Sequence, residues 1–289
     1  MAAVWRITWA WVLASAVCVA WGGEYYGRLG GGAAYDDNVT RGADNQFRRG
    51  DFSYRVSGVS GVDWRLGERL GLALEARVDG SQYQRFERLS SLRGVLLARA
   101  LFKPFDGYTA PWFALESEGG AIGHKDSALR DRWEWSGRAL AGARLTDRLS
   151  ASLGYQYGLT RGAQWGVWNT DTHALLTSLQ YALTPKVNLF VDYRLTVGKH
   201  NATAAWSQGR WSYPAYDVRW RDKALEADTG VAVYAYRMDG VSHQVAVGGA
   251  WDVGHRWGLE LAGRYFVLDG EAGASYQGLG GSIGANYRF

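Results

Sequence analysis

Residues 149–160 read LSASLGYQYGLT, and this stretch decides the fold class. Apolar and aromatic side chains stand at every second position from Leu149 to Leu159, and Ser, Gly, Gln or Thr fill the positions between them. A period of two predicts a β-strand with one apolar and one polar face. Ten residues at ~3.3 Å each, tilted by ~40°, rise roughly 25 Å, the apolar height that a membrane-spanning strand covers. A soluble β-sandwich also alternates, so the rest of the chain chooses between the two.

Two kinds of connection separate the alternating segments. The short ones are residues 65–69, 103–107, 146–148, 184–186 and 252–256. The long ones are residues 36–51, 81–90, 118–131, 161–171, 199–240 and 269–275. Short turns at one end and long loops at the other are typical of an antiparallel up-and-down transmembrane β-barrel, whose turns face the periplasm and whose loops face the exterior.

These connections predict an all-β fold with twelve strands. We expect the strands near residues 25–35, 52–64, 70–80, 91–102, 108–117, 132–145, 149–160, 172–183, 187–198, 241–251, 257–268 and 276–289. An even number places both termini at the periplasmic end. The long external loop 199–240 leaves an alternative open, because GVAVYAYR at 230–237 has the composition of a strand. As a spanning strand it gives a barrel of fourteen; as part of a hairpin on the loop it leaves twelve, which we prefer.

The composition of the 289 residues fits one barrel better than two soluble domains. Gly is abundant at 39, Pro is scarce at 4, and Trp and Tyr are frequent at 15 and 17. The mean hydropathy is slightly polar, as expected for a barrel that alternates polar and apolar residues. The basic pI comes from arginines that this barrel places in its lumen and loops, so nucleic acid is not an expected partner.

The N-terminus has the layout of a secretory signal peptide. Arg6 precedes an apolar run from Ile7 to about Val19, and small residues follow. The run is shorter than the ~20 residues of a transmembrane helix, which is the alternative. We therefore expect residues 1–22 to be removed, by cleavage after Ala20 or Gly22, and residues 23–289 to form the barrel. Cys18 lies in the removed part, so the mature chain offers no cysteine for a disulfide or a metal.

The C-terminus carries a specific motif, SIGANYRF at 282–289. Its polar, glycine and two aromatic positions are Ser282, Gly284, Tyr287 and Phe289, and together they resemble the C-terminal signal of Gram-negative outer-membrane β-barrel proteins. The whole chain resembles the small proteobacterial barrels of this class that lack a periplasmic repeat domain. This resemblance implies the cell outer membrane as location, the β-barrel assembly machinery as partner during insertion, and lipid and lipopolysaccharide as surroundings. It implies nothing about the oligomeric state.

The alternation also predicts which charges face the lumen. The inward basic residues are Arg28, Arg55, Arg77, Arg93, Arg99, Arg132, Arg138, Arg144, Arg194, Arg264 and Arg288. The inward acids are Asp63, Glu75, Asp79, Glu116, Glu134, Asp192, Asp252 and Glu260. The positive excess would favour anions in an open lumen. The alternative is that the charges pair and fill the barrel. Small inward residues, such as Gly30, Ser152 and Gly284, leave space for either arrangement.

The loop 199–240 concentrates aromatic and basic residues. Its binding candidates are Trp206, Trp211, Tyr213, Tyr216 and Trp220. Aromatic rings beside cations could bind a glycan or an anionic polymer, whereas the simpler interpretation is that the loop packs over its own barrel. YDDN at 35–38 is interpreted as an Asx turn rather than a calcium site. No cofactor is expected.

The sequence gives little support to an enzyme. Lipid-hydrolysing barrels need Ser and His together on the wall, but Ser242 and His243 are adjacent and so point to opposite faces of a strand. His173 is expected to face lipid. Three hypotheses follow: a channel or export conduit for small or polymeric anions such as acidic sugars; a non-conducting barrel that binds a surface glycan or partner through loop 199–240; and a lipid-modifying enzyme.

Overall fold

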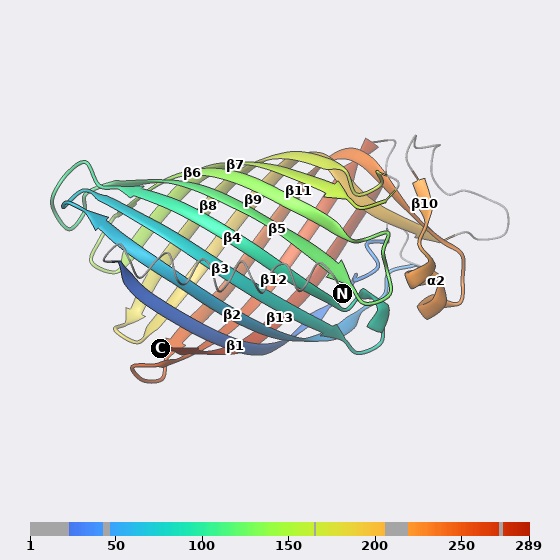
Figure 1. Cartoon of the computed structure of the whole chain (residues 1–289), viewed down its shortest axis with the longest axis horizontal. Helices are drawn as coiled ribbons and strands as arrows, with labels where there is room; N and C mark the ends of the chain where they lie inside the picture. The colour runs from blue at the N-terminus through green and yellow to red at the C-terminus, as the bar shows by residue number, and fades with distance from the viewer. Residues whose placement is uncertain (1–22, 43–46, 165, 206–218, 272–273) are drawn as a thin grey trace.

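The protein forms a closed β-barrel whose strands are tilted relative to the barrel axis (Figure 1). The computed structural model describes residues 23–42, 47–164, 166–205, 219–271 and 274–289. The strands in these ranges are β1 (Glu24–Asp36), β2 (Asp51–Leu66), β3 (Leu70–Tyr83), β4 (Ser91–Phe102), β5 (Trp112–His124), β6 (Arg132–Arg144), β7 (Leu149–Gly162), β8 (Thr170–Thr184), β9 (Val187–Ala205), β10 (Arg219–Arg221), β11 (Val233–Asp252), β12 (Trp257–Gly270) and β13 (Ser275–Arg288). Two short helices, η1 (Glu87–Leu89) and α2 (Lys223–Thr229), lie in the connections. No helix in the described ranges is long and apolar enough to cross a membrane.

Sheet closure follows from the pairing order. Each strand from β1 to β8 pairs antiparallel with the next, β9 pairs with β11, β11 with β12, β12 with β13, and β13 with β1. β10 has three residues and pairs only with the outer part of β11, so it is not a wall strand. Twelve strands therefore form the wall in the described part of the chain, as the sequence predicts. We call the end that carries the short connections the turn end, and the opposite end the loop end.

The strands beside the longest loop are longer than expected. β9 continues to Ala205 and β11 begins at Val233, and these two residues are paired in register. The segment 230–237 is therefore not a separate strand, because its residues from Val233 onward extend β11 beyond the wall. The connection that remains is 206–232, rather than 199–240.

β5 also differs from its expected bounds of 108–117. Its start moves to Trp112 because residues 103–111 form a wider turn, in which Gly107 has a φ of 122°. Its end moves to His124 because the glycines after Glu118 continue the ladder rather than break it. At Gly120 a Cβ would meet the carbonyl oxygen of Gly94 at 2.4 Å, so the close backbone approach requires glycine there.

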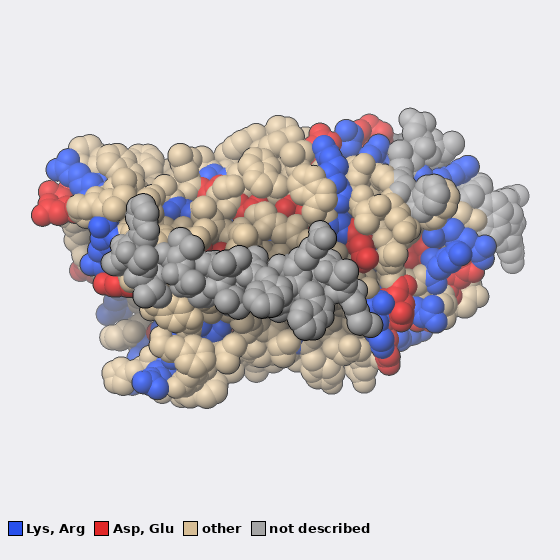
Figure 2. All heavy atoms as spheres, viewed as in Figure 1, with Lys and Arg blue, Asp and Glu red and all other residues tan. Residues whose placement is uncertain are grey.

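The outer face of the wall is apolar. Leu115, Leu153 and Leu261 are each more than half exposed, which suits a surface in contact with lipid rather than water. Figure 2 shows that charged side chains gather toward the two ends of the barrel on the visible face, while its middle is mostly uncharged.

The C-terminal motif lies on the seam between the last strand and the first. The backbone N–H of Phe289 donates to the carbonyl oxygen of Gly27 at 3.0 Å, and its side chain is 68% exposed on the outer face. The Tyr287 ring contacts both Phe289 and Trp257, with ring centroids 5.2 and 5.1 Å away. Ser282 and Gly284 face the lumen. The two aromatic residues therefore belong to an outward cluster at the turn end.

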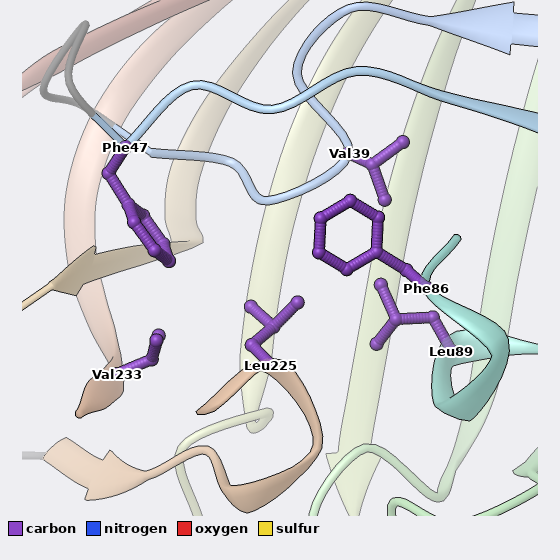
Figure 3. Close-up of a cluster of buried hydrophobic side chains, with 6 residues drawn as sticks. All are labelled: Val39, Phe47, Phe86, Leu89, Leu225 and Val233. Atoms are coloured by element: carbon purple, nitrogen blue, oxygen red, sulfur yellow. The ribbon is translucent and has the colours of Figure 1, made fainter. Parts of the chain in front are cut away.

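Several connections pack together at the loop end. We call this packed region the cap; its largest buried cluster comprises Val39, Phe47, Phe86, Leu89, Leu225 and Val233, drawn in Figure 3. A second cluster joins Leu129, Val167 and Ala235. These apolar side chains come from five connections and from the outer part of β11, which supports them.

The first loop crosses the loop end of the barrel. Gly42 forms a parallel bridge with Thr203 of β9, and the Thr203 hydroxyl donates to the carbonyl oxygen of Thr40. Because β11, β12 and β13 stand between β9 and β1 in the wall, a loop that leaves β1 reaches β9 only across the opening. Asn38 is fully buried on this path and donates to the carbonyl oxygen of Gln277 at 2.8 Å.

Candidate functional site

The predicted basic residues of the lumen lie on the inward face of their strands. They alternate with exposed apolar residues: Arg55, for example, lies between Tyr54 and Val56, which are 59% and 66% exposed. The same alternation places Arg28, Arg77, Arg93, Arg99, Arg132, Arg138, Arg144, Arg194 and Arg264 inward. The surroundings of these arginines differ between two walls of the barrel.

On one wall the arginines are paired with carboxylates. Arg93 lies 2.8 Å from Glu118, 3.0 Å from Glu134 and 3.9 Å from Asp79. We call the wall from β3 to β6 the paired wall; its other ion pairs are Arg77–Glu75, Arg99–Glu116, Arg132–Glu134, Arg138–Glu116 and Arg138–Glu118, at 2.7, 2.6, 3.4, 3.0 and 2.9 Å. These arginines neutralise neighbouring carboxylates, which limits the net charge they present to a solute.

Glu118 is a lumen residue that the sequence analysis missed. The predicted long loop 118–131 includes it. Glu116 and Glu118 nevertheless keep the period of two, and that spacing was the signal that could have placed both on one face. In the structure Glu118 connects Arg93 to Arg138 across three strands.

The neighbouring part of the wall, formed by β13, β1 and β2 and joined to the paired wall through the pairing of β2 with β3, has a different character. Arg28 and Arg55 have no ion pair or hydrogen-bond partner for their guanidinium groups within the described residues. They border a hollow of about 510 Å³ whose floor includes Gly30, Gly32, Ser57, Ser282 and Gly284. Three further charged residues line it, namely Arg77, Asp79 and Glu260, so the hollow holds three arginines and two acids. We call this the open wall.

The hollow exists because the backbones of the open wall approach closely. At Gly32 a Cβ would meet the carbonyl oxygen of Ile283 at 2.4 Å, and at Gly30 it would meet the Ser57 hydroxyl at 2.6 Å. Because these positions cannot carry a larger side chain, they leave space between Arg28 and Arg55, as the sequence predicts.

The remaining arginines have individual partners. Arg194 donates to the side-chain oxygen of Gln156 at 3.1 Å. Arg144 lies over the Tyr108 ring, with its guanidinium carbon 4.4 Å from the centroid. Arg264 lies 3.3 Å from Asp36.

The YDDN segment stabilises the loop end of the first strand. Asp36 contacts Arg41 as well as Arg264, and it accepts from the backbone N–H of Asn38 at 2.9 Å, which is the predicted Asx turn. Asp37 accepts from the backbone N–H of Leu279 at 2.7 Å. Within the described ranges, no group of His, Cys, Asp and Glu has the arrangement of a metal site.

Most of the predicted loop aromatics lie outside the described residues, namely Trp206, Trp211, Tyr213 and Tyr216. Trp220 is described: it belongs to β10 and is 40% exposed. The structure therefore places one of the five at the loop end, and the binding role of this group stays a prediction.

The histidines that were considered for catalysis contact tyrosines on the outer face. The Tyr155 hydroxyl lies 2.6 Å from Nδ1 of His173, and the Tyr193 hydroxyl lies 2.9 Å from Nδ1 of His243. Ser242 is paired with Thr196 on the lumen side of the sheet, opposite to His243. This arrangement does not bring Ser242 and His243 together as a nucleophile and a base.

The architecture is shared with known membrane proteins. One similar solved structure is the COG4313 outer membrane channel from Pseudomonas putida F1, with 10% sequence identity, a TM-score of 0.58, and coverage of 92% of this chain and 96% of that one. The fold is that of an outer-membrane β-barrel. Less similar are the KdgM porin in complex with disordered oligogalacturonate (11% identity, TM-score 0.43, 90% and 99% coverage) and the NanC porin (8%, 0.45, 90% and 98%).

No protein-family model matches the chain, and no curated protein matches its sequence. At identities this low, the structural likeness to outer-membrane channels carries the fold and not the solute.

Proposed function

We propose that the protein is an outer-membrane channel or export conduit that favours small or polymeric anions. The observation that carries this proposal is the pair of arginines on the open wall. Arg28 and Arg55 lie on the lumen face without a carboxylate partner among the described residues, and they border a hollow of about 510 Å³. Unneutralised guanidinium groups in a narrow aqueous space raise the local concentration of anions.

The paired wall supports the proposal in another way. Its arginines and acids compensate each other at distances of 2.6 to 3.9 Å, so this side adds little net charge. In the hollow of the open wall, Arg28, Arg55 and Arg77 outnumber Asp79 and Glu260, so the positive excess of the lumen lies on this side. This differs from the expectation that Arg93, Arg99 and Arg138 attract anions themselves.

The test is a measurement of ion selectivity. The mature protein is reconstituted in a planar bilayer, and single-channel conductance and reversal potential are recorded across a salt gradient. We expect steady conductance with anions more permeant than cations. We also expect the double variant Arg28→Gln/Arg55→Gln to lose most of that preference while it still conducts.

Arg256→Gln is the matched control. Arg256 donates to the Tyr287 hydroxyl at 2.9 Å near the outer aromatic cluster, so its replacement removes one positive charge without changing the lumen wall. An equal loss of selectivity in this variant would assign the anion preference to overall charge, and would contradict a role for the open wall.

The rival proposal is a non-conducting barrel that binds a surface glycan or a partner at its loop end. The cap favours it, because buried side chains from several connections pack across that end. A barrel that is silent in the bilayer, but folded by the heat-dependent shift of its gel mobility, would support this rival and contradict the channel. Such a protein should lose its binding when residues 206–232 are replaced by a short linker.

We further propose the orientation that the resemblance implies. The turn end and both termini then face the periplasm, and the assembly machinery recognises Ser282, Gly284, Tyr287 and Phe289. Protease cleavage in whole cells tests the orientation, because sites introduced into the cap should be cut from outside whereas a site in the turn 145–148 should not.

A further inference from the structure

A cavity of about 570 Å³ opens on the paired-wall side of the lumen near the turn end. It lies between the turn 103–111 and those parts of β4 to β8 that are nearest the turn end. Its lining combines one tryptophan, several small hydroxyl side chains and three cations. The residues that the argument uses are Trp112, Arg144, Lys103, Ser150, Ser152 and Ser178.

Trp112 brings an indole ring to the inside of the barrel. Large aromatic side chains on these strands mostly face outward, as Phe113 and Trp135 do. The Trp112 ring fits inward because its cross-strand neighbour is Gly142, where a Cβ would meet Cζ2 of Trp112 at 2.4 Å. The indole therefore lies over the backbone of β6 and forms an apolar surface within the cavity.

A hydroxyl-rich floor continues from this indole. Gly142 pairs with Ser152, Ser152 pairs with Ser178, and Ser150 pairs with Gln180. None of these serine or glutamine side chains has a hydrogen-bond partner among the described residues. They present unused donors and acceptors on a surface of small residues, which is the complement of a solute with many hydroxyl groups.

Two cations next to the floor also lack carboxylate partners in the described part of the chain. They are Arg144 and Lys103, whereas Arg99 in the same cavity is engaged by Glu116 at 2.6 Å. Arg144 rests on the Tyr108 ring, whose hydroxyl donates to the carbonyl oxygen of Asp147 at 3.1 Å. The aromatic contact holds the guanidinium group in place and leaves its donors available for a carboxylate.

We propose that this cavity binds an acidic saccharide, and the proposal rests on the proposed function by naming the solute class of the conduit. The indole offers an apolar face to a sugar ring, the serines and Gln180 pair with hydroxyl groups, and Arg144 and Lys103 bind the carboxylate. A simple inorganic anion would use the cations alone and would leave the indole and the serines unused. A neutral sugar would leave the cations unused.

The position of the cavity implies a direction. It opens at the turn end, whereas the cap lies at the loop end, so a saccharide reaches this site without displacing the cap. In the proposed orientation the saccharide therefore arrives from the periplasm, which makes the site the entry of an export conduit.

Isothermal titration of the folded protein in detergent tests the site. The probe is a tetrasaccharide of mannuronic acid, with maltotetraose as the uncharged sugar and sulfate as the simple anion. We expect binding of the uronate alone. Trp112→Ala and Arg144→Gln should each weaken it by about 10-fold, as expected for one ring or one charged contact.

Phe190→Ala is the matched control. Phe190 also points inward over a glycine of the next strand, since a Cβ at Gly248 would meet its ring at 2.4 Å, but it does not line the cavity. The affinity of the Phe190→Ala variant for the uronate should equal that of the unaltered protein. Equal binding of maltotetraose or sulfate, no binding of the uronate, or an unchanged affinity in Arg144→Gln would overturn the site.

The same preparation separates this inference from the proposed function. Anion-selective conductance without uronate binding would retain the channel and remove the saccharide site. Uronate binding that is lost in Arg144→Gln, in a barrel that does not conduct, would retain the site and remove the channel.

Discussion

Arg130 and Asp222 form a buried ion pair that joins two connections of the cap. Nε and Nη2 of Arg130 both donate to one carboxylate oxygen of Asp222, at 2.9 and 2.7 Å, and the Asp222 side chain has no exposed surface. The other carboxylate oxygen accepts from the backbone N–H of Leu225 at 3.2 Å and caps the N-terminus of α2. One side chain thus places the helix and connects it to the loop after β5.

Asp222→Asn should loosen the cap and leave the barrel intact. Asparagine caps a helix as well as aspartate does, so the variant removes the charge and keeps the cap hydrogen bond. Arg130 would then be a buried cation without its partner, at a cost of about 3–5 kcal/mol. Hydrogen exchange should show loss of protection in residues 219–235 with no change in the strands of the paired wall.

Glu226→Gln is the control for that variant. Glu226 lies on the same helix and pairs with Arg221 of β10, where solvent screens the interaction. The hydrogen-exchange protection of the Glu226→Gln variant should match that of the unaltered protein. Equal loss of protection in both variants would show that any charge change on α2 disturbs the cap.

Asp228 should make the cap more stable at mildly acidic pH. Burial raises the pKa of its carboxyl group, and the neighbouring Arg88, 3.7 Å away, offsets this only in part. Because the folded-state pKa lies above the unfolded value, the charged form is penalised at neutral pH, and the penalty disappears as the pH falls through the folded pKa toward ~4. Hydrogen exchange of α2, followed from pH 7 down to pH ~4 and corrected for the intrinsic exchange rate, measures this, and Asp228→Asn should remove the difference.

Arg93→Gln should destabilise the barrel, whereas Arg28→Gln should not. Arg93 bridges Glu118 and Glu134, and without it each carboxylate keeps only one cation, Arg138 and Arg132 respectively. We expect a loss of roughly 1–3 kcal/mol, because charged groups lose their hydrogen-bond partner. Arg28 has no such partner among the described residues, so its replacement should change ion selectivity alone. Denaturant unfolding in detergent separates the two, and similar midpoints would contradict the division into two walls.

Asp51→Ala should disorder the loop between β3 and β4. The buried carboxylate of Asp51 accepts from the backbone N–H groups of Arg85 and Phe86 at 3.0 and 2.9 Å. Removal of the acceptor leaves two buried donors unsatisfied, at about 1–3 kcal/mol each. Limited proteolysis should then cut within residues 84–90, whereas Glu87→Gln on the surface of the same loop should remain resistant.

The sequence predicts the wall well because the wall is a local pattern. In residues 149–160 apolar and polar side chains alternate, so the face of each residue can be assigned from its direct neighbours. The outer face is almost entirely apolar because it contacts lipid. The same pattern places Arg28, Arg93 and Arg194 inward without knowledge of any partner. The glycines that follow Glu118 carry no side chain to continue the alternation, so the pattern is weakest at the end of β5.

The cap and the charge pairing could not be predicted in the same way. Whether Arg93 is neutralised depends on the positions of Glu118 and Glu134, which lie on two other strands. Whether Phe86 is a loop residue or a core residue depends on Val39 and Leu225, from connections far away in the chain. Both are relations between distant segments, and periodicity carries no information about them.

The seam between β1 and β13 has a consequence for biogenesis. Every other pairing of the wall joins strands that follow one another along the chain, apart from β9 and β11 with β10 between them. The seam joins Arg28 to Arg288, so its contacts have the largest sequence separation in the barrel, and we expect them to form last. Until β13 is available, β1 exposes an unpaired edge on which other strands could aggregate. We therefore expect the chain to need protection from aggregation throughout its synthesis and transit, with closure of the seam as the slow step.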